Sequence, residues 1–188
     1  MEKKQDARVR YTKMVIRNSL IELMREKPVA KVSVTELCER AGINRATFYA
    51  HYSDPSDLLR SIEEEILGEL SCWIGPAIRA QGSDLTAILT SIIEYIGENA
   101  DICSVLLSDT GDASFQSKVV NAIERPFLAD FSTRLASQEE AEHLYTFAAD
   151  GSVGMIKKWL SRGMEAPPSA LAEIITRFTS QGFSALTG

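Results

Sequence analysis

Residues 33–52 constrain the fold of this chain most strongly, because their pattern predicts two short helices joined by a glycine turn. Ser33 is the predicted N-cap of the first helix, and Glu36 completes a capping box in which each side chain accepts from the other residue's backbone N–H. Gly42 ends this helix, since glycine adopts the left-handed conformation without steric cost. The residues on its apolar face are Val34, Leu37, Cys38 and Ala41.

The second helix of this pair carries the candidate binding groups. We expect Asn44 to be its N-cap and residues 45–51 to form about two turns, with Phe48 facing inward. The outward residues place a guanidinium, a hydroxyl and a phenol near free backbone N–H groups, a combination that binds phosphate oxygens and base edges in a DNA major groove. The pattern therefore predicts a helix-turn-helix whose second helix reads DNA. The outward residues are Arg45, Ala46, Thr47 and Tyr49.

The same segment resembles a known family. Residues 42–49, with His51 and Tyr52 and the acidic stretch 53–59, resemble the DNA-binding domain of the TetR family of bacterial transcriptional regulators. The resemblance covers about residues 8–60, and over the rest of the chain it extends only to the layout of the helices. It implies a regulator, expected to be a repressor, that binds a double-stranded DNA operator as a homodimer and responds to an effector.

One position departs from the family pattern. The family usually has a lysine there that holds a DNA phosphate, but this chain has Pro55, which begins a helix well after the cap Asp54 yet supplies neither a positive charge nor an N–H. We therefore expect the phosphate to be held by the basic N-terminal arm together with Thr35, Arg45, Tyr49 and His51. The full set of predicted DNA-binding residues is Arg10, Ser33, Thr35, Asn44, Arg45, Ala46, Thr47, Tyr49 and His51.

The net charge of −6 conceals an asymmetry between the two ends of the chain. Residues 1–60 hold 12 Lys and Arg against 8 Asp and Glu, a net charge of +4, whereas residues 61–188 carry a net charge of −10. Basic side chains in the N-terminal arm can follow a phosphate backbone and make binding steeply salt-dependent. The basic residues of the arm are Lys3, Lys4, Arg8, Arg10, Lys13 and Arg17. For Lys3 and Lys4, a solvated terminus is an equally good interpretation.

No segment shows the alternation of a strand, so we predict an all-α fold of about nine helices. Residues 1–54 are expected to form a three-helix helix-turn-helix DNA-binding domain, and residues 55–188 a helical effector-binding and dimerisation domain. Further helices are predicted over about residues 8–27, 55–79, 85–98, 101–107, 113–135 and 139–162, with a last helix after Pro168. The glutamates expected to face mostly solvent in the helix 55–79 are Glu63, Glu64, Glu65 and Glu69.

The last two helices each carry an apolar stripe, and two such helices meeting their symmetry mates would form a four-helix interface between two copies of the chain. The first stripe is unusually rich in small residues, so backbones can approach closely there. The resemblance implies the same arrangement, since family members typically dimerise through their last two helices. The alternative, that both stripes pack inside one subunit, stays open. The predicted interface residues are Ala148, Gly151, Met155, Trp159, Leu171, Ile174, Ile175 and Phe178.

The resemblance also implies an effector site among the helices between about residues 58 and 160. Apolar pockets favour aromatic side chains with a few polar groups, although each such residue is more often ordinary core. The effector is unknown and is either a small molecule or, as for some relatives, a partner protein. The candidate pocket residues are Trp73, Tyr95, Cys103, Phe115, Phe127, His143, Tyr145 and Phe147.

Other classes of function are disfavoured. The chain has only His51 and His143, and no glycine-rich phosphate loop, HExxH motif or nucleophile elbow, so we expect no enzyme and no catalytic residue. Its three cysteines are far apart, which predicts reduced core cysteines rather than a metal site, a disulfide framework or a redox sensor, and we expect no cofactor. No apolar stretch approaches the roughly 18 residues of a membrane span, and the first 30 residues lack a signal-peptide core, so we expect a cytoplasmic protein without a membrane partner.

Overall fold

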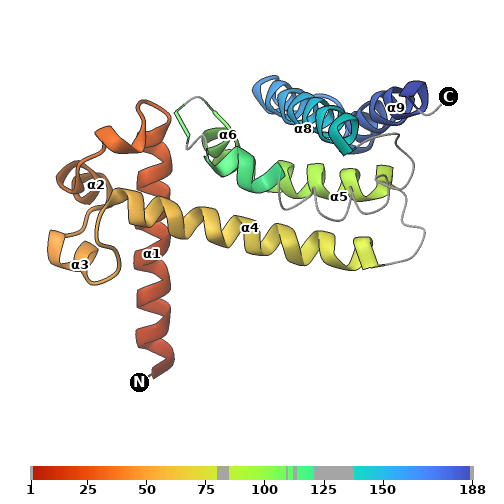
Figure 1. The fold of residues 1–188 in the computed structure, drawn as a ribbon. Coiled ribbons are helices and arrows are strands. Elements are labelled where there is room, and N and C mark those ends of the chain that lie inside the picture. The colour runs from red at the N-terminus through yellow and green to blue at the C-terminus, as the bar shows by residue number, and fades with distance from the viewer. Residues whose placement is uncertain (1, 80–84, 109, 112–113, 121–137, 187–188) are drawn as a thin grey trace. The chain divides into compact units, whose positions relative to one another are not determined.

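The computed structural model of the 188-residue chain describes residues 2–79, 85–108, 110–111, 114–120 and 138–186. Within these ranges every regular element is a helix, which confirms the all-α prediction (Figure 1). The chain divides into two compact units. Unit 1 comprises Met1–Ile66 and Val105–Asp112, and unit 2 comprises Leu67–Ser104 and Ala113–Gly188. The predicted domain boundary between residues 54 and 55 stays a prediction.

Unit 1 is built around α1 (Glu2–Met24), a helix of 23 residues that begins earlier than the sequence pattern predicts. It packs against the short 3₁₀ helix η1 (Val29–Lys31) and against α2 (Val34–Ala41), and α2 packs against α3 (Arg45–Tyr49). The long helix α4 (Pro55–Arg79) begins in this unit. Each fully buried apolar side chain contributes roughly 1.5–3 kcal/mol by leaving water. The side chains with no exposed surface here are Ile16, Leu20, Leu23, Met24, Leu37, Phe48 and Leu58.

One glutamate of α4 contradicts the expectation of solvent exposure. Glu63 is only 1% exposed, whereas Glu64, Glu65 and Glu69 are exposed as predicted. The reason is its place in the helix, four residues after the buried Leu59 and therefore on the inward face. A glutamate at a position of the buried stripe is therefore buried, although its charge favours solvent.

Unit 2 contains α5 (Leu85–Glu98), α8 (Gln138–Ser161) and α9 (Pro168–Leu186), together with most of α6 (Ala100–Leu106). The helix α9 packs along α5 and also contacts α8. Residues 114–120 are helical, and the remainder of the helix predicted to reach residue 135 lies outside the described residues. The buried side chains of α5 include Ile92, Ile93 and Ile96, and those of α9 include Ala172 and Ile175.

A tight turn holds the end of α8 close to α5. Gly163 ends the helix at φ +73°, and the next residue, Met164, also has a positive φ of 60° and donates its N–H to the Trp159 carbonyl at 3.0 Å. The Trp159 indole Nε1 donates to the Ala166 carbonyl at 2.7 Å, which fixes the ring. A Cβ at Gly97 would lie 3.0 Å from that ring, so a glycine allows α5 to approach it.

Candidate nucleic-acid interface

The turn between α2 and α3 forms as the sequence predicts. Gly42 has φ +64° and ψ 32°. The N–H of Ile43 donates to the Cys38 carbonyl at 3.0 Å, so the turn gives both this N–H and this carbonyl a hydrogen-bond partner. A Cβ at residue 42 would meet no atom within 4 Å. Glycine is therefore required here for its backbone conformation, and not because neighbouring atoms leave no room for a side chain.

The start of α3 is fixed by its cap. Asn44 has an extended backbone, and its Oδ1 accepts from the Thr47 backbone N–H at 2.7 Å and from the Thr47 hydroxyl at 2.9 Å. The helix runs from Arg45 to Tyr49, so it is shorter than predicted and His51 lies in the turn that follows. The predicted N-cap is confirmed, and it holds both the backbone and the side chain of Thr47.

The two faces of α3 differ as the sequence predicts. Phe48 is fully buried, and its ring makes an edge contact with Tyr49 at a centroid distance of 5.6 Å. Tyr49 is nevertheless 57% exposed, and Arg45 and Ala46 are exposed. Thr47 is half-buried. The short helix thus anchors itself by one aromatic side chain and leaves a guanidinium and a phenol accessible.

A hydrogen bond joins two of the predicted DNA-binding residues across the turn. The Arg45 guanidinium donates through Nη2 to the Thr35 hydroxyl, and both residues are exposed. Because the Thr35 oxygen accepts this bond, its own proton is free to point to another acceptor. Thr35 on α2 and Arg45 on α3 therefore present donors side by side.

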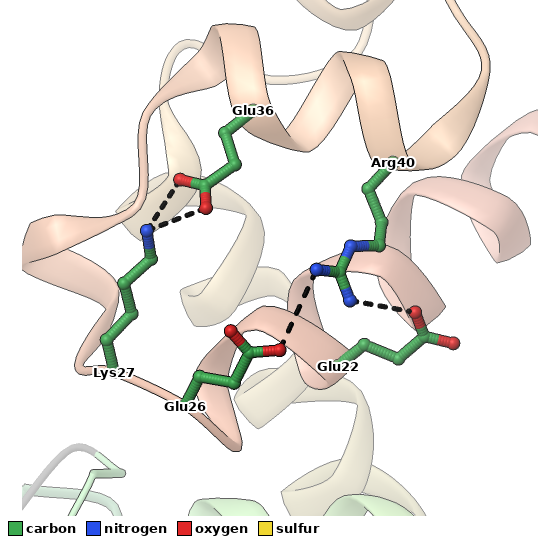
Figure 2. Close-up of polar contacts among 5 residues, drawn as sticks. All are labelled: Glu22, Glu26, Lys27, Glu36 and Arg40. Carbon is green, nitrogen blue, oxygen red and sulfur yellow. Dashed lines mark hydrogen bonds and ion pairs between the residues drawn. The ribbon is translucent and has the colours of Figure 1, made fainter.

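Ion pairs tie α2 to the end of α1 and to the turn that follows it (Figure 2). Lys27 Nζ lies 2.7 Å from both carboxylate oxygens of Glu36, and Arg40 lies 3.5 Å from Glu22 and 3.7 Å from Glu26. The pKa of the Glu36 carboxyl is lowered, first by the hydrogen bond from Lys27 and more weakly by one from the Ser33 backbone N–H. Exposed pairs of this kind each contribute little to stability, because water screens them. Two cationic side chains, Lys27 and Arg40, thus engage three glutamates inside the unit that carries α3.

The first turn of α2 matches the predicted capping box. The Ser33 hydroxyl accepts from the Glu36 backbone N–H at 3.2 Å, and the Ser33 N–H interacts with the Glu36 carboxylate in return. Sequence reasoning did not foresee that Lys27 holds the same carboxylate, because residue 27 lies outside α2. The box is therefore also linked to the turn that follows α1.

A second reciprocal cap begins α4. Asp54 Oδ1 accepts from the Asp57 backbone N–H at 2.8 Å, and Asp57 Oδ2 accepts from the Ser53 backbone N–H at 3.0 Å. Hydrogen bonds from Ser53 lower the pKa of the Asp57 carboxyl. The predicted cap at Asp54 is confirmed, and Pro55 is buried behind it. Both carboxylates at this helix start are thus engaged by backbone N–H groups.

The N-terminal half of α1 is uncovered. Arg8, Arg10 and Lys13 are exposed, and so are apolar residues between them, with Tyr11 at 64% and Met14 at 49%. Figure 1 shows this end of α1 extending beyond α2 and α3. Arg8, Arg10 and Lys13 of the predicted basic arm are therefore helical and accessible, whereas Arg17 is half-buried and pairs with Glu65 at 2.7 Å. The side chains of Lys3 and Lys4 lie outside the described residues.

The candidate pocket residues divide into buried and exposed groups. Tyr95 is 3% exposed and donates its hydroxyl to Glu69 Oε2 at 2.7 Å. Its ring lies 6.1 Å from the ring of Trp73, tilted by 53°, and Trp73 is itself 46% exposed. His143 is exposed, and Phe147 is 77% exposed. Phe127 lies outside the described residues. The remaining candidates are buried, namely Cys103, Phe115 and Tyr145.

A hollow of about 420 Å³ lies elsewhere, on the surface between the end of α8 and the start of α9. Gly151 and Gly154 contribute no side chain to it, and Lys158 and Arg162 stand at its border. None of the candidate pocket residues lines it. Four predicted interface residues do: Gly151, Met155, Trp159 and Leu171.

The predicted interface stripes are split between the inside and the outside of unit 2. Trp159, Leu171 and Ile175 are at most 8% exposed, so they pack within the subunit. Ile174 is 37% and Phe178 66% exposed, while Gly151 is exposed and Ala148 and Met155 are half-buried. Sequence reasoning missed that the exposed Phe147 belongs to the same side of α8, although it lies four residues before Gly151. The interface itself stays a prediction.

Two of the three cysteines are core residues as expected, and the third is not. Cys38 and Cys103 are buried, and burial raises the pKa of the Cys38 thiol, whereas Cys72 is exposed and is not a core residue. In the part of the chain that the structure describes, no three His, Cys, Asp or Glu side chains are grouped to hold a metal ion. None of the described helices is long and apolar enough to cross a membrane.

Comparisons with known proteins extend over most of the chain. Residues 16–62 match the family described as "Bacterial regulatory proteins, tetR family", and residues 83–181 match "Transcriptional regulator C-terminal region", described for the same kind of regulator. Among similar solved structures is a TetR transcriptional regulator from Streptococcus agalactiae, with 22% identity and a TM-score of 0.67, covering 95% of this chain and 99% of that one.

Two further structures share the fold at lower identity. The dihydroxyacetone kinase operon activator DhaS is 18% identical with a TM-score of 0.60, over 94% of this chain and 98% of that one. NalD, the secondary repressor of a multidrug efflux pump in Pseudomonas aeruginosa, is 17% identical with a TM-score of 0.61, over 93% and 97% of the two chains. At these identities the likeness establishes the fold alone.

Proposed function

Because the chain belongs to the TetR family of bacterial transcriptional regulators, we propose that it binds a palindromic double-stranded DNA operator as a homodimer, with α3 in the major groove. The observation that carries this proposal is the division of α3 between a buried Phe48 and an exposed Arg45 and Tyr49. A guanidinium and a phenol held on a rigid, capped turn suit phosphate oxygens and base edges.

Phosphate anchoring is assigned to groups other than the residue at the start of α4. Pro55 is buried and lacks an N–H, so it offers nothing to a phosphate oxygen. The exposed Arg8, Arg10 and Lys13 of α1, together with the Thr35 and Arg45 pair, supply donors and positive charge instead. Binding is then expected to weaken steeply as salt concentration rises.

Two copies are needed because a single short helix contacts too few base pairs for useful selectivity. Exposed apolar side chains on α8 and α9 support an interface there, above all Phe147 at 77%, Phe178 at 66% and Ile174 at 37%. Covering such side chains removes apolar surface from water, which favours association. We assign the homodimer contact to this side of the two helices.

Control by an effector is the third part of the proposal. We place the effector in unit 2, from which α4 runs as one continuous helix, Pro55–Arg79, to the cap beside α3. An effector that binds only one arrangement of this helix shifts the population of DNA-binding dimers without chemistry. A small molecule is the first candidate. The alternative is a partner protein.

The sign of regulation is proposed as repression, as for NalD, with activation, as for DhaS, the alternative. The proposed role requires no catalytic residue, cofactor or membrane. It places the protein in the cytoplasm, where the DNA it reads is found.

The test is a mobility-shift titration of the full chain on a duplex that the wild type has selected from random sequences. We expect Tyr49→Ala to abolish binding and Tyr49→Phe to weaken it partly, with helicity and dimer mass unchanged. Unaltered affinity of Tyr49→Ala would show that the exposed face of α3 does not read DNA.

A further inference from the structure

Three side chains of unit 2 form a mixed aromatic and acidic cluster between α4 and α5. Tyr95 of α5 is buried and donates its hydroxyl to Glu69 Oε2 at 2.7 Å. The Tyr95 ring lies 6.1 Å from the ring of Trp73, tilted by 53°. Glu69 and Trp73 are four residues apart on α4, so they are neighbours on one face of that helix. Two helices therefore build the cluster, and a hydrogen bond joins them.

Two members of this cluster expose groups that the protein leaves available. The Trp73 side chain is 46% exposed, although a tryptophan ring offers one of the largest apolar surfaces to bury. Glu69 is exposed too, and among the described residues no cationic side chain pairs with its carboxylate. The bond from Tyr95 fixes this carboxylate through Oε2 and leaves Oε1 for another partner.

The chemistry of the cluster favours a cation. The face of an indole attracts a positive charge within about 6 Å, more strongly than other aromatic rings do, and a carboxylate attracts the same charge. Both groups repel an anion, and a neutral molecule gains nothing from the carboxylate. The surroundings have the same sign, because residues 61–188 carry a net charge of −10. Charge complementarity therefore selects a positively charged organic molecule.

We propose that Glu69, Trp73 and Tyr95 form a binding site for an organic cation with an alkylated ammonium group, and that this cation is the effector. The ammonium group lies over the exposed indole and beside the carboxylate, which Tyr95 holds in place. Two of the three residues belong to α4, so the cation binds the same continuous helix that begins after the Asp54 cap. The role as effector rests on the proposed function, whereas the binding of the cation does not.

The first experiment measures binding in the absence of DNA. The full chain is titrated with choline at constant ionic strength, and NMR follows the indole N–H signals of its two tryptophans, which Trp73→Leu assigns. Trp159 is the internal control, because its ring is buried and its Nε1 donates to the Ala166 carbonyl. We expect choline to shift the Trp73 signal and not the Trp159 signal. Dimethylbutanol, the neutral isostere with carbon in place of the nitrogen, should bind at least about fivefold more weakly.

A pair of matched variants tests the carboxylate. Glu69→Gln removes the charge but keeps an oxygen that accepts from the Tyr95 hydroxyl. Glu64→Gln removes the same charge from another exposed position of α4. We expect Glu69→Gln to raise the dissociation constant of choline at least about threefold and Glu64→Gln to change it clearly less. The site would be overturned by the absence of a Trp73 shift, by equal affinity for dimethylbutanol, or by wild-type affinity in Glu69→Gln.

The second experiment tests the role as effector. In a mobility-shift titration on the duplex selected by the wild type, choline at a concentration that saturates the Trp73 signal should change DNA affinity at least about fivefold. The same concentration should change the affinity of Glu69→Gln less. Unchanged DNA affinity with choline bound would overturn this role. Failure of the wild type to select any sequence is a different outcome, because it removes the proposed function while the first experiment still decides the site.

Discussion

Replacing Gly42 by alanine tests whether the turn between α2 and α3 depends on backbone conformation alone. Residue 42 has φ +64°, and a Cβ there would meet nothing within 4 Å, so the substitution adds no clash and removes no contact. The cost is that of an L-residue in the left-handed region, about 1–2 kcal/mol, offset in part because alanine loses less entropy on folding. We expect Gly42→Ala to lower the free energy of unfolding by about 1 kcal/mol.

Gly68→Ala is the matched control for this prediction. Gly68 lies in the interior of α4, and a Cβ there also meets nothing within 4 Å, but its backbone is helical. The same chemical change should therefore raise the free energy of unfolding by roughly 0.5–1 kcal/mol. Gly42→Asn should cost less than Gly42→Ala, because asparagine tolerates the left-handed region better.

Urea unfolding followed by circular dichroism of the helices measures all three variants. The reasoning predicts opposite signs for the two alanine substitutions. A Gly42→Ala protein as stable as the wild type, or more stable, would refute the claim that the turn requires a residue in the left-handed conformation at position 42.

Three further predictions concern packing, assembly and acid stability. Gly97→Ala should lower the free energy of unfolding by about 1 kcal/mol, because its Cβ would press at 3.0 Å on the fixed Trp159 ring; a stabilised protein in urea unfolding would contradict this. Ile174→Glu with Phe178→Glu should yield monomers in light scattering, and a surviving two-fold dimer would count against the proposed interface. The pKa of the Glu36 carboxyl is lowered in the folded state, so its contribution is present above the pKa of the unfolded chain and is lost as pH falls through the folded pKa. Glu36→Gln should therefore flatten the acid side of a stability profile, and an unchanged profile would argue against a role for the Lys27 pair.

The local features of the DNA-binding motif were predictable from the sequence because they depend on residues three to five positions apart. The Ser33 and Asn44 caps, the left-handed Gly42 and the buried Phe48 all follow from such short-range signals. The extent of α3 was overestimated, since the chain leaves the helix after Tyr49.

Features that depend on packing between elements were not predictable in the same way. Lys27 reaches Glu36 from the turn after α1, and Glu63 is buried although its residue type favours solvent. The apolar stripes of the last two helices gave no means of telling which residues pack on α5 and which stay exposed. Trp159 and Ile175 point inward, whereas Phe178 points outward. Only the positions of the neighbouring helices decide this.

The central claim is that α3 of two copies reads two half-sites on one duplex. Selection of random DNA duplexes by the full-length wild-type chain, with sequencing of the bound fraction, tests it most directly. The account predicts enrichment of an inverted repeat whose half-sites are about 10 base pairs apart or a multiple of that, and loss of this enrichment in Tyr49→Ala. Recovery of random sequence by the wild type, or the same inverted repeat from Tyr49→Ala, would contradict it.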